Sequence, residues 1–277
     1  MPAPLQLPST PTMRGKGVFV THDAIGAGPR GEREWDDLAA CGVSWVALQV
    51  AWLRSTGARP VRSERTRDLA RLSSEVYAAQ RRGIAAWLWG WPVPSRVADF
   101  ARIVAESTRA LEEAPVPGGS ARPAGWILNT EVAEPGGARA WAEGSEGAAA
   151  ELLEATREAW DGPVYLTTHG RLTRRQPWRV LSHVDGVLPQ VYDPECQYGA
   201  GGDGSTFASR CVDSYRDVMG DKPVVALLGA NSTTSACMAR LAADAAVVTD
   251  GALGWWSWTS LRASAPKRAV VAGVKLP

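Results

Sequence analysis

The sequence predicts one α/β domain folded as a single closed (β/α)8 TIM barrel, because strand-like and helix-like segments alternate along the whole chain. Eight strands with helices between them can be placed, and no stretch in the middle has the composition of an interdomain linker. An open doubly wound sheet is the alternative, and it usually carries a GxGxxG turn that leads into a helix after the first strand. The glycine-rich segment 26–31 does not continue into a helical pattern, so we favour the barrel.

Short apolar runs bounded by Gly and Pro predict the strands. We expect them at 17–21, 44–51, 84–89, 125–131, 163–168, 186–192, 223–228 and 252–257. Apolar residues at helical spacing predict the helices between them, and Gly42 is a typical stop for the first. We expect these helices at 34–40, 65–82, 95–113, 138–160, around Trp178, and at 205–219 and 233–246.

Residues 1–14 are predicted to form a Pro-rich arm ahead of the barrel, which would then occupy residues 15–277. Proline excludes regular helix and central strand, and this segment holds Pro2, Pro4, Pro8 and Pro11. Such an arm is either a free tail or a segment that docks onto a larger assembly.

Composition excludes several classes of function. The 30 basic and 29 acidic residues give a net charge of +1, which is untypical of a nucleic-acid-binding domain. No apolar run is long enough to span a membrane, and the start of the chain lacks the basic and apolar regions of a signal peptide. We therefore expect synthesis in the cytoplasm as a soluble protein.

The four cysteines form no CxxC pair and no Cys/His cluster at zinc spacing, so we predict no metal and no cofactor. We expect Cys41, Cys196, Cys211 and Cys237 to be free buried thiols, with a Cys196–Cys211 disulfide as the alternative.

Glu131 is the most informative residue. It ends the apolar run 125–131, and the period of two in a strand places Asn129 on the same side. Because burying a charge is costly, a carboxylate at this position indicates either a task or a solvated loop residue.

Barrel enzymes carry their chemistry at the C-terminal ends of the strands, and this chain concentrates polar and aromatic residues there. The set is His22, Asp23, Trp52, Trp87, Trp89, Trp91, Asn129, Glu131, His169, Gln190, Tyr192, Asp193, Trp256 and Trp258. Trp rings stack on the C–H faces of a sugar, while amide and hydroxyl groups pair with its polar substituents. Each Trp alone would be read as core packing; together they indicate a glycan site.

Three of these segments resemble glycoside hydrolase family 18, the chitinase and hevamine-like barrels. The run Gly125–Glu131 resembles the family's fourth-strand motif, which ends in Asp-x-Glu with the Glu as proton donor. The segment from Gln190 through Asp193 resembles the sixth strand, whose Tyr holds the substrate acetamido group. The segment 251–257 resembles the eighth strand, where a Trp, here Trp256, forms the floor of the sugar site.

The sequence also departs from the family pattern. The acidic residue two before the Glu is Asn129, and the earlier aspartates fall on Ala124 and Ile127. The third-strand Ser-x-Gly-Gly is replaced by the segment 87–90. An Asn-x-Glu pair occurs in related endo-N-acetylglucosaminidases, where the Asn holds the reacting acetamido group, so Asn129 is compatible with the same mechanism.

The resemblance implies a retaining hydrolase of an N-acetylhexosamine-containing polysaccharide such as peptidoglycan or a chitin-like glycan. Glu131 would be the acid, Asn129 and Tyr192 would hold the acetamido group, and the substrate-binding residues would be Trp256, Gln190, Asp193, Trp89 and Trp258. A two-carboxylate variant similar to family 25 muramidases would use Asp23, Glu134 or Asp193 as the partner of Glu131.

The alternative is a catalytically degenerate barrel that binds glycans or builds part of a phage tail, virion or other assembly. The departures from the motif and the Pro-rich arm favour this hypothesis. A wall-degrading barrel without a signal peptide is expected on a phage particle or among proteins released by lysis, so both hypotheses share one setting.

Overall fold

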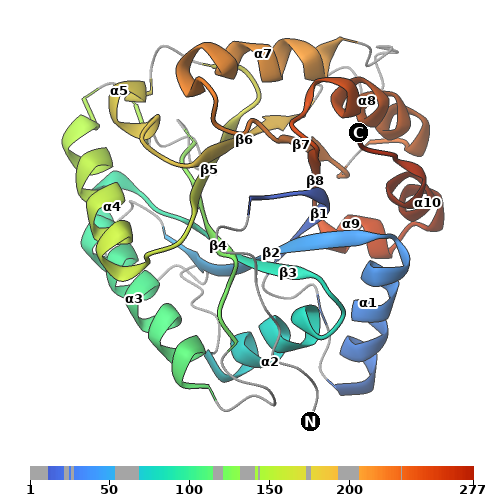
Figure 1. The fold of residues 1–277 in the computed structure, drawn as a ribbon, viewed down its shortest axis with the longest axis horizontal. Coiled ribbons are helices and arrows are strands. Elements are labelled where there is room, and N and C mark those ends of the chain that lie inside the picture. Colours follow the sequence, from blue (N-terminus) through green and yellow to red (C-terminus); the bar gives the residue numbers. More distant parts are fainter. Residues whose placement is uncertain are drawn as a thin grey trace.

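The computed structural model describes residues 12–21, 25, 28–53, 69–114, 121–131, 141–142, 144–172, 176–192, 206–231 and 233–277, with backbone alone for residues 28–30. Eight parallel strands close into a barrel in sequence order, β1 to β8, and helices surround them (Figure 1). The predicted (β/α)8 barrel is confirmed. The strands are β1 (Gly15–Val20), β2 (Val43–Trp52), β3 (Ala85–Trp91), β4 (Gly125–Asn129), β5 (Val164–His169), β6 (Gly186–Val191), β7 (Ala226–Gly229) and β8 (Ala252–Trp256).

The outer ring contains helices that mostly agree with the sequence prediction. They are α1 (Gly28–Ala40), α2 (Leu69–Gln80), α3 (Val97–Glu113), α4 (Glu146–Ala159), α5 (Trp178–Leu181), α7 (Phe207–Met219), α8 (Ser235–Val248), α9 (Trp258–Arg262) and α10 (Ala265–Gly273), with a 3-10 turn η1 (Pro94–Arg96) before α3. None of these helices combines the length and apolar character that a bilayer span requires.

Two helical regions differ from the prediction. Helix α1 begins at Gly28, inside the glycine-rich segment that was expected to stay outside a helix. Proline is tolerated in the first turn, because the N–H that it lacks has no partner within the helix there, so Pro29 does not stop α1. Helix α10 was not predicted; it begins with Pro266 in its first turn and a Ser264 side chain that accepts from the N–H of Lys267.

The apolar core has an outer and an inner layer. The outer layer packs the helices against the strands, whereas the inner layer fills the barrel with residues that include Phe19, Trp45, Trp87 and Tyr165. Trp45 fits because the neighbouring strands present glycine at Gly17, where an added Cβ would collide with its ring, and at Gly254.

Met13 closes the barrel interior at the N-terminal ends of the strands. It is 1% exposed and belongs to the inner layer, and the carbonyl of Arg14 accepts a hydrogen bond from the Ser44 hydroxyl at 2.8 Å. The last residues of the predicted arm 1–14 therefore pack with the barrel. The prediction for residues 1–11 lies outside the described residues.

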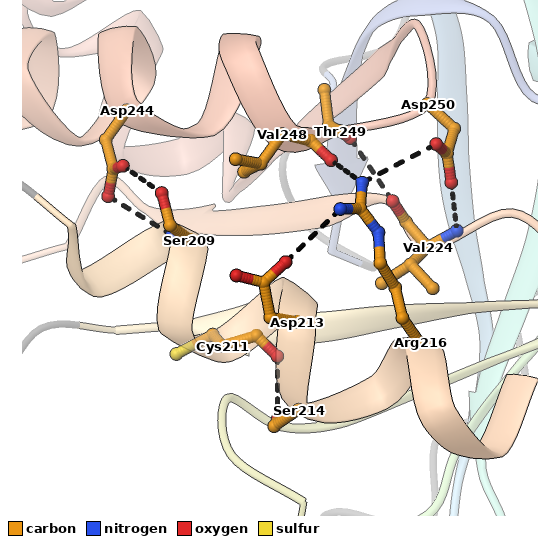
Figure 2. A network of polar contacts seen from close by, with 10 residues as sticks. All are labelled: Ser209, Cys211, Asp213, Ser214, Arg216, Val224, Asp244, Val248, Thr249 and Asp250. Carbon is orange, nitrogen blue, oxygen red and sulfur yellow. Dashed lines mark hydrogen bonds and ion pairs between the residues drawn. The ribbon is translucent and has the colours of Figure 1, made fainter.

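The N-terminal ends of the strands are fixed by ion pairs and capped N–H groups (Figure 2). Arg216 of α7 contacts Asp213 at 3.2 Å and Asp250 at 3.8 Å, and it donates to the carbonyl of Val248. Asp250 in turn accepts the N–H of Val224 at 2.9 Å. These contacts join α7 to the connections before β7 and β8, at the end of the barrel opposite the expected site.

The cysteines fit the prediction in part. Cys41 and Cys211 are free and buried, which excludes a Cys196–Cys211 disulfide. Burial raises the pKa of the Cys41 thiol, so it stays protonated at neutral pH. Cys237, at the start of α8, is disulfide-bonded and is not the free thiol that we expected. Cys196 lies outside the described residues.

Candidate functional site

The candidate site lies at the mouth, by which we mean the C-terminal ends of the strands and the residues that follow them. Glu131 stands two residues after β4 ends, and hydrogen bonds hold its backbone on both sides. The N–H of Thr130 donates to the carbonyl of Thr167 at 2.9 Å, and the N–H of Trp141 donates to the carbonyl of Glu131 at 3.1 Å. This arrangement places the carboxylate at a defined point beside β5.

A buried polar cluster supports this point from the outer side of the strands. The hydroxyl of Thr168 donates to the carbonyl of Thr130 at 2.9 Å, and the amide nitrogen of Gln176 donates to the same carbonyl at 2.5 Å. Gln176 also contacts the Thr168 hydroxyl at 2.6 Å and is 5% exposed. Because buried polar groups are costly unless they are paired, the cluster fixes the ends of β4 and β5 to each other.

Gln190 of β6 connects the two polar residues of β4. Its amide nitrogen donates to Oε1 of Glu131 at 2.6 Å and lies 3.3 Å from Oδ1 of Asn129. Asn129 is buried, whereas Gln190 and Glu131 are half-buried and open toward the mouth. The structure thus brings together three of the predicted site residues, and an amide sets the orientation of the carboxylate.

Tyr192 follows β6 and is close enough to feel the charge of Glu131. Burial raises the pKa of the Tyr192 phenol well above its usual value, and the negative charge of Glu131 raises it further. The hydroxyl therefore stays protonated at neutral pH and is available as a hydrogen-bond donor. The backbone N–H of Tyr192 donates to the carbonyl of Gln190 at 2.8 Å, which turns the chain at the strand end.

Trp256 occupies the other side of the mouth. It is half-buried at the end of β8, with its ring centroid 5.5 Å from Phe19 and 5.1 Å from Trp89. The mouth therefore has an aromatic side at the end of β8, where Trp256 packs on the buried rings of Phe19 and Trp89, and a polar side made by β4, β5 and β6.

Three tryptophans do not line the mouth as the sequence predicted. Trp89 is 1% exposed and fills the barrel beneath Trp256, so it supports the ring above it and has no free face for a sugar. Trp258 is 1% exposed in the outer layer, because β8 ends at Trp256 and helix α9 begins at Trp258. Trp91 packs in the outer layer, where its ring is stacked on that of Trp52, its partner in β2, with the ring centroids 5.7 Å apart.

Four of the predicted site residues are not among the described residues. They are His22, Asp23, Glu134 and Asp193. His169 is described: it ends β5, pairs in register with Gln190, and its carbonyl accepts the Tyr215 hydroxyl at 2.5 Å.

Two polar residues near the mouth were missed in the sequence. Gln49 of β2 is 6% exposed and pairs in register with Trp89, on the inward-facing side of its strand. The sequence does carry a signal for Gln49: it is a polar residue on the same side of the strand as Trp45 and Ala47, in an otherwise mostly apolar run. Gln176 has no comparable signal, because it belongs to an irregular connection. Within the described residues, no three His, Cys, Asp or Glu side chains gather as a metal site would require.

Comparisons with known proteins bear on the fold. No protein-family model and no curated protein sequence matches the chain. Among solved structures, the endo-1,4-β-mannanase from Rhizomucor miehei is 12% identical with a TM-score of 0.65, over 92% of this chain and 88% of that one. A GH5_18 protein from Bifidobacterium longum subsp. infantis is 14% identical with a TM-score of 0.67, over 95% and 78%.

The tamarind chitinase-like lectin is 13% identical with a TM-score of 0.59, over 95% of this chain and 99% of that one. At such low identity, these similarities establish a shared TIM-barrel fold. Membership of family 18 and the phage setting stay predictions. The fold of this chain is that of TIM-barrel glycoside hydrolases and of a chitinase-like lectin.

Proposed function

We propose that the barrel is a glycoside hydrolase in which Glu131 is the general acid. The observation that carries the proposal is the bridge formed by Gln190, which holds the Glu131 carboxylate beside Asn129 at the mouth. A general acid has to be fixed within reach of the leaving oxygen, and this bridge supports such positioning. Gln190 occupies Oε1, which leaves Oε2 to carry the proton.

The reaction that fits these groups uses the substrate's own acetamido group. Glu131 protonates the glycosidic oxygen as the C1–O bond breaks, and the acetamido carbonyl oxygen forms a bond to C1 on the opposite face. Water then attacks C1 as the bond between C1 and the acetamido oxygen breaks, and Glu131 accepts a proton from the water, so the configuration is retained. Asn129 and Tyr192 orient the acetamido group, and Trp256 stacks beneath the sugar ring.

The substrate-assisted mechanism needs a single carboxylate. Among the strand ends that the structure describes, Glu131 is the one carboxylate, and a substrate-assisted reaction needs no second. A two-carboxylate mechanism would require Asp23, Glu134 or Asp193, which lie outside the described residues. The proposed substrates are polysaccharides that contain N-acetylhexosamine, such as peptidoglycan or chitin-like glycans.

One observation favours a second candidate, a barrel that binds glycans without cleaving them, alone or as part of a phage tail or other assembly. Asn129 stands two residues before Glu131 in place of an acidic residue, and this departure favours a barrel without catalytic activity. The lectin among the similar structures supports glycan binding as a use of this fold.

Replacing Glu131 by Gln separates the two candidates. An amide keeps the shape of the side chain but delivers no proton, so we expect turnover to fall by about 10²- to 10⁴-fold while glycan binding persists. The assay compares wild type, Glu131→Gln and Glu158→Gln on peptidoglycan, chitin and chitooligosaccharides. Glu158 is exposed on α4 and serves as the control, whose rate should equal that of wild type. Equal background rates for all three proteins would leave binding as the function.

A further inference from the structure

Two exposed arginines flank an aromatic ring beside the polar side of the mouth. The guanidinium carbons of Arg171 and Arg210 each lie 5.8 Å from the centre of the Phe207 ring. Arg171 comes shortly after β5 and Arg210 lies in the first turns of α7, which follows β6. Because the barrel is parallel, both positions belong to the C-terminal end of the strands. We call Arg171 and Arg210 the rim arginines.

The rim arginines differ from other arginines of this protein in their partners. Arg157, Arg216 and Arg262 each form an ion pair with a carboxylate. Over the part of the chain that the structure describes, the rim arginines form none, and Arg210 donates to the hydroxyl of Thr206 at 2.7 Å. Two guanidinium groups that both lie near one ring and have no carboxylate partner among the described residues concentrate positive charge there, which favours the binding of an anion.

The carboxylate that faces this end of α7 is already engaged. Oδ2 of Asp244 accepts the N–H groups of Ala208 at 2.7 Å and Ser209 at 3.3 Å, and Oδ1 accepts the Ser209 hydroxyl. Asp244 therefore caps the start of α7, and Figure 2 shows its contacts with Ser209; among the described residues, no ion pair joins it to a rim arginine.

A short chain of contacts relates Arg171 to Glu131. Gly170 packs against the carbonyl of Gln190 so closely that an added Cβ would collide with it. On the other side of Arg171, the N–H of Leu172 donates to the hydroxyl of Ser214 at 3.1 Å. The backbone around Arg171 is thus held between β6 and α7, next to the residue that binds Glu131.

We propose that the rim arginines form a subsite for an anionic group, a carboxylate or a phosphate, on the glycan that enters the mouth. Guanidinium groups bind both kinds of oxyanion through paired N–H donors, and the Phe207 ring orients them through its face. The whole protein has a net charge of only +1, so the positive charge at the rim arginines is a local feature.

This inference rests on the proposed function, because the anion would belong to the same glycan that meets Glu131. The subsite would favour one of the proposed substrates over the other. A neutral chitin-like chain has no anionic group to place there, whereas an acidic glycan such as peptidoglycan has one.

The test measures binding of three glycans by calorimetry at low and high salt. Chitohexaose is neutral, peptide-free peptidoglycan strands carry carboxylates, and poly(glycerol phosphate) carries phosphates. The double variant Arg171→Gln/Arg210→Gln removes the subsite. Arg33→Gln/Arg109→Gln, two exposed arginines on α1 and α3, removes the same charge elsewhere and is the control.

We expect wild type to bind at least one anionic glycan more tightly than chitohexaose, with an affinity that falls as salt rises. The rim variant should lose about tenfold in affinity for that glycan, and the control should lose little. The anionic glycan that responds identifies the group as carboxylate or phosphate.

The outcomes separate this inference from the function beneath it. Equal losses in the rim and control variants, or binding of chitohexaose as tight as that of both anionic glycans, would overturn the subsite. If glycans are still cleaved in a Glu131-dependent reaction, the proposed function survives that result. Absence of binding to all three glycans would overturn both.

Discussion

At the scale of single residues, Glu131 owes its position to its neighbours along and across the strands. The strand ends at Asn129, and beyond it the carbonyl of Thr130 accepts hydrogen bonds from Thr168 and Gln176. A side chain whose neighbouring backbone is held by buried hydrogen bonds, and which itself accepts a bond from Gln190, loses little freedom when substrate binds, as a preorganised site requires.

Gln176→Leu tests this support. The variant removes both donations by Gln176, so we expect a loss in stability of about 1–3 kcal/mol together with a fall in kcat at nearly unchanged KM. Thr156→Val is the control, since it removes a buried hydrogen bond within α4, far from the mouth. It should lower stability alone. A Gln176→Leu enzyme with unchanged kcat would show that Gln176 has no positioning role.

Trp256→Ala tests the aromatic side of the mouth. Stacking serves bound substrate and transition state alike, so we expect weaker glycan binding and a matching fall in kcat/KM. Trp258→Ala is a useful comparison, because Trp258 is buried in the outer layer and should affect unfolding instead. The readouts are calorimetric affinity and Tm. Unchanged glycan affinity in Trp256→Ala would remove the stacking role.

At the scale of elements, two parts of the barrel are built alike. Asp185 precedes β6, accepts the N–H of Val164 at 2.8 Å and contacts Arg157 of α4 at 2.7 Å. Asp250 precedes β8, accepts the N–H of Val224 and contacts Arg216 of α7 (Figure 2). Each Asp is followed by Gly and caps the neighbouring strand. These contacts stabilise the N-terminal ends of the strands, opposite the mouth that holds the candidate site.

Asp250→Ala leaves the buried N–H at Val224 without its acceptor. We expect the free energy of unfolding to fall by about 1–3 kcal/mol, and Asp185→Ala should behave similarly. Glycan affinity should not change, since both residues lie away from the mouth. Asp161→Ala removes an exposed partner of Arg122 and should cost less than either. Thermal unfolding and calorimetry together check this, and a loss no larger than that of Asp161→Ala would contradict it.

Strand periodicity predicted most of the elements but failed where the chain leaves regular structure. The eight strands follow from apolar runs, and inward parity correctly paired Asn129 with Gln190. The same parity was wrong for Trp91, which packs in the outer layer, and for Trp258, because β8 had already ended. The alternation of side chains holds only while a strand stays regular. The point at which a strand ends or becomes irregular is therefore not predictable when the sequence carries no sign of it.

At the scale of the whole molecule, the barrel is filled with apolar side chains toward the N-terminal ends of its strands and is polar at the mouth. Met13, Trp45, Trp87 and Tyr165 fill the interior, whereas amides, a carboxylate and a half-buried Trp line the mouth. The contacts that close the lower end join segments far apart in sequence, such as the N–H of Gly15 with the carbonyl of Gly251 at 2.8 Å. Composition alone does not predict such contacts, because they depend on closure of the sheet.

The filled interior makes stability sensitive to alkaline pH. Burial foremost raises the pKa of Tyr165 to about 12, against about 10 in an unfolded chain. Burial also raises the pKa of Tyr192 and of Tyr215. Between these values the unfolded state has released protons that the folded state retains, so the free energy of unfolding falls as pH rises. The stabilisation is complete below pH about 10 and is lost on approach to pH about 12.

We therefore expect urea unfolding to show a steep loss of stability over this pH range. Tyr165→Phe has no ionisable hydroxyl, so its stability should fall less steeply with pH than that of wild type. Tyr77→Phe, on α2 outside the barrel, is the control and should follow the wild-type slope. Absorbance of tyrosinate, recorded on the same samples, reports whether ionisation accompanies unfolding. Identical slopes for wild type and Tyr165→Phe would mean that this buried hydroxyl does not couple folding to alkaline pH.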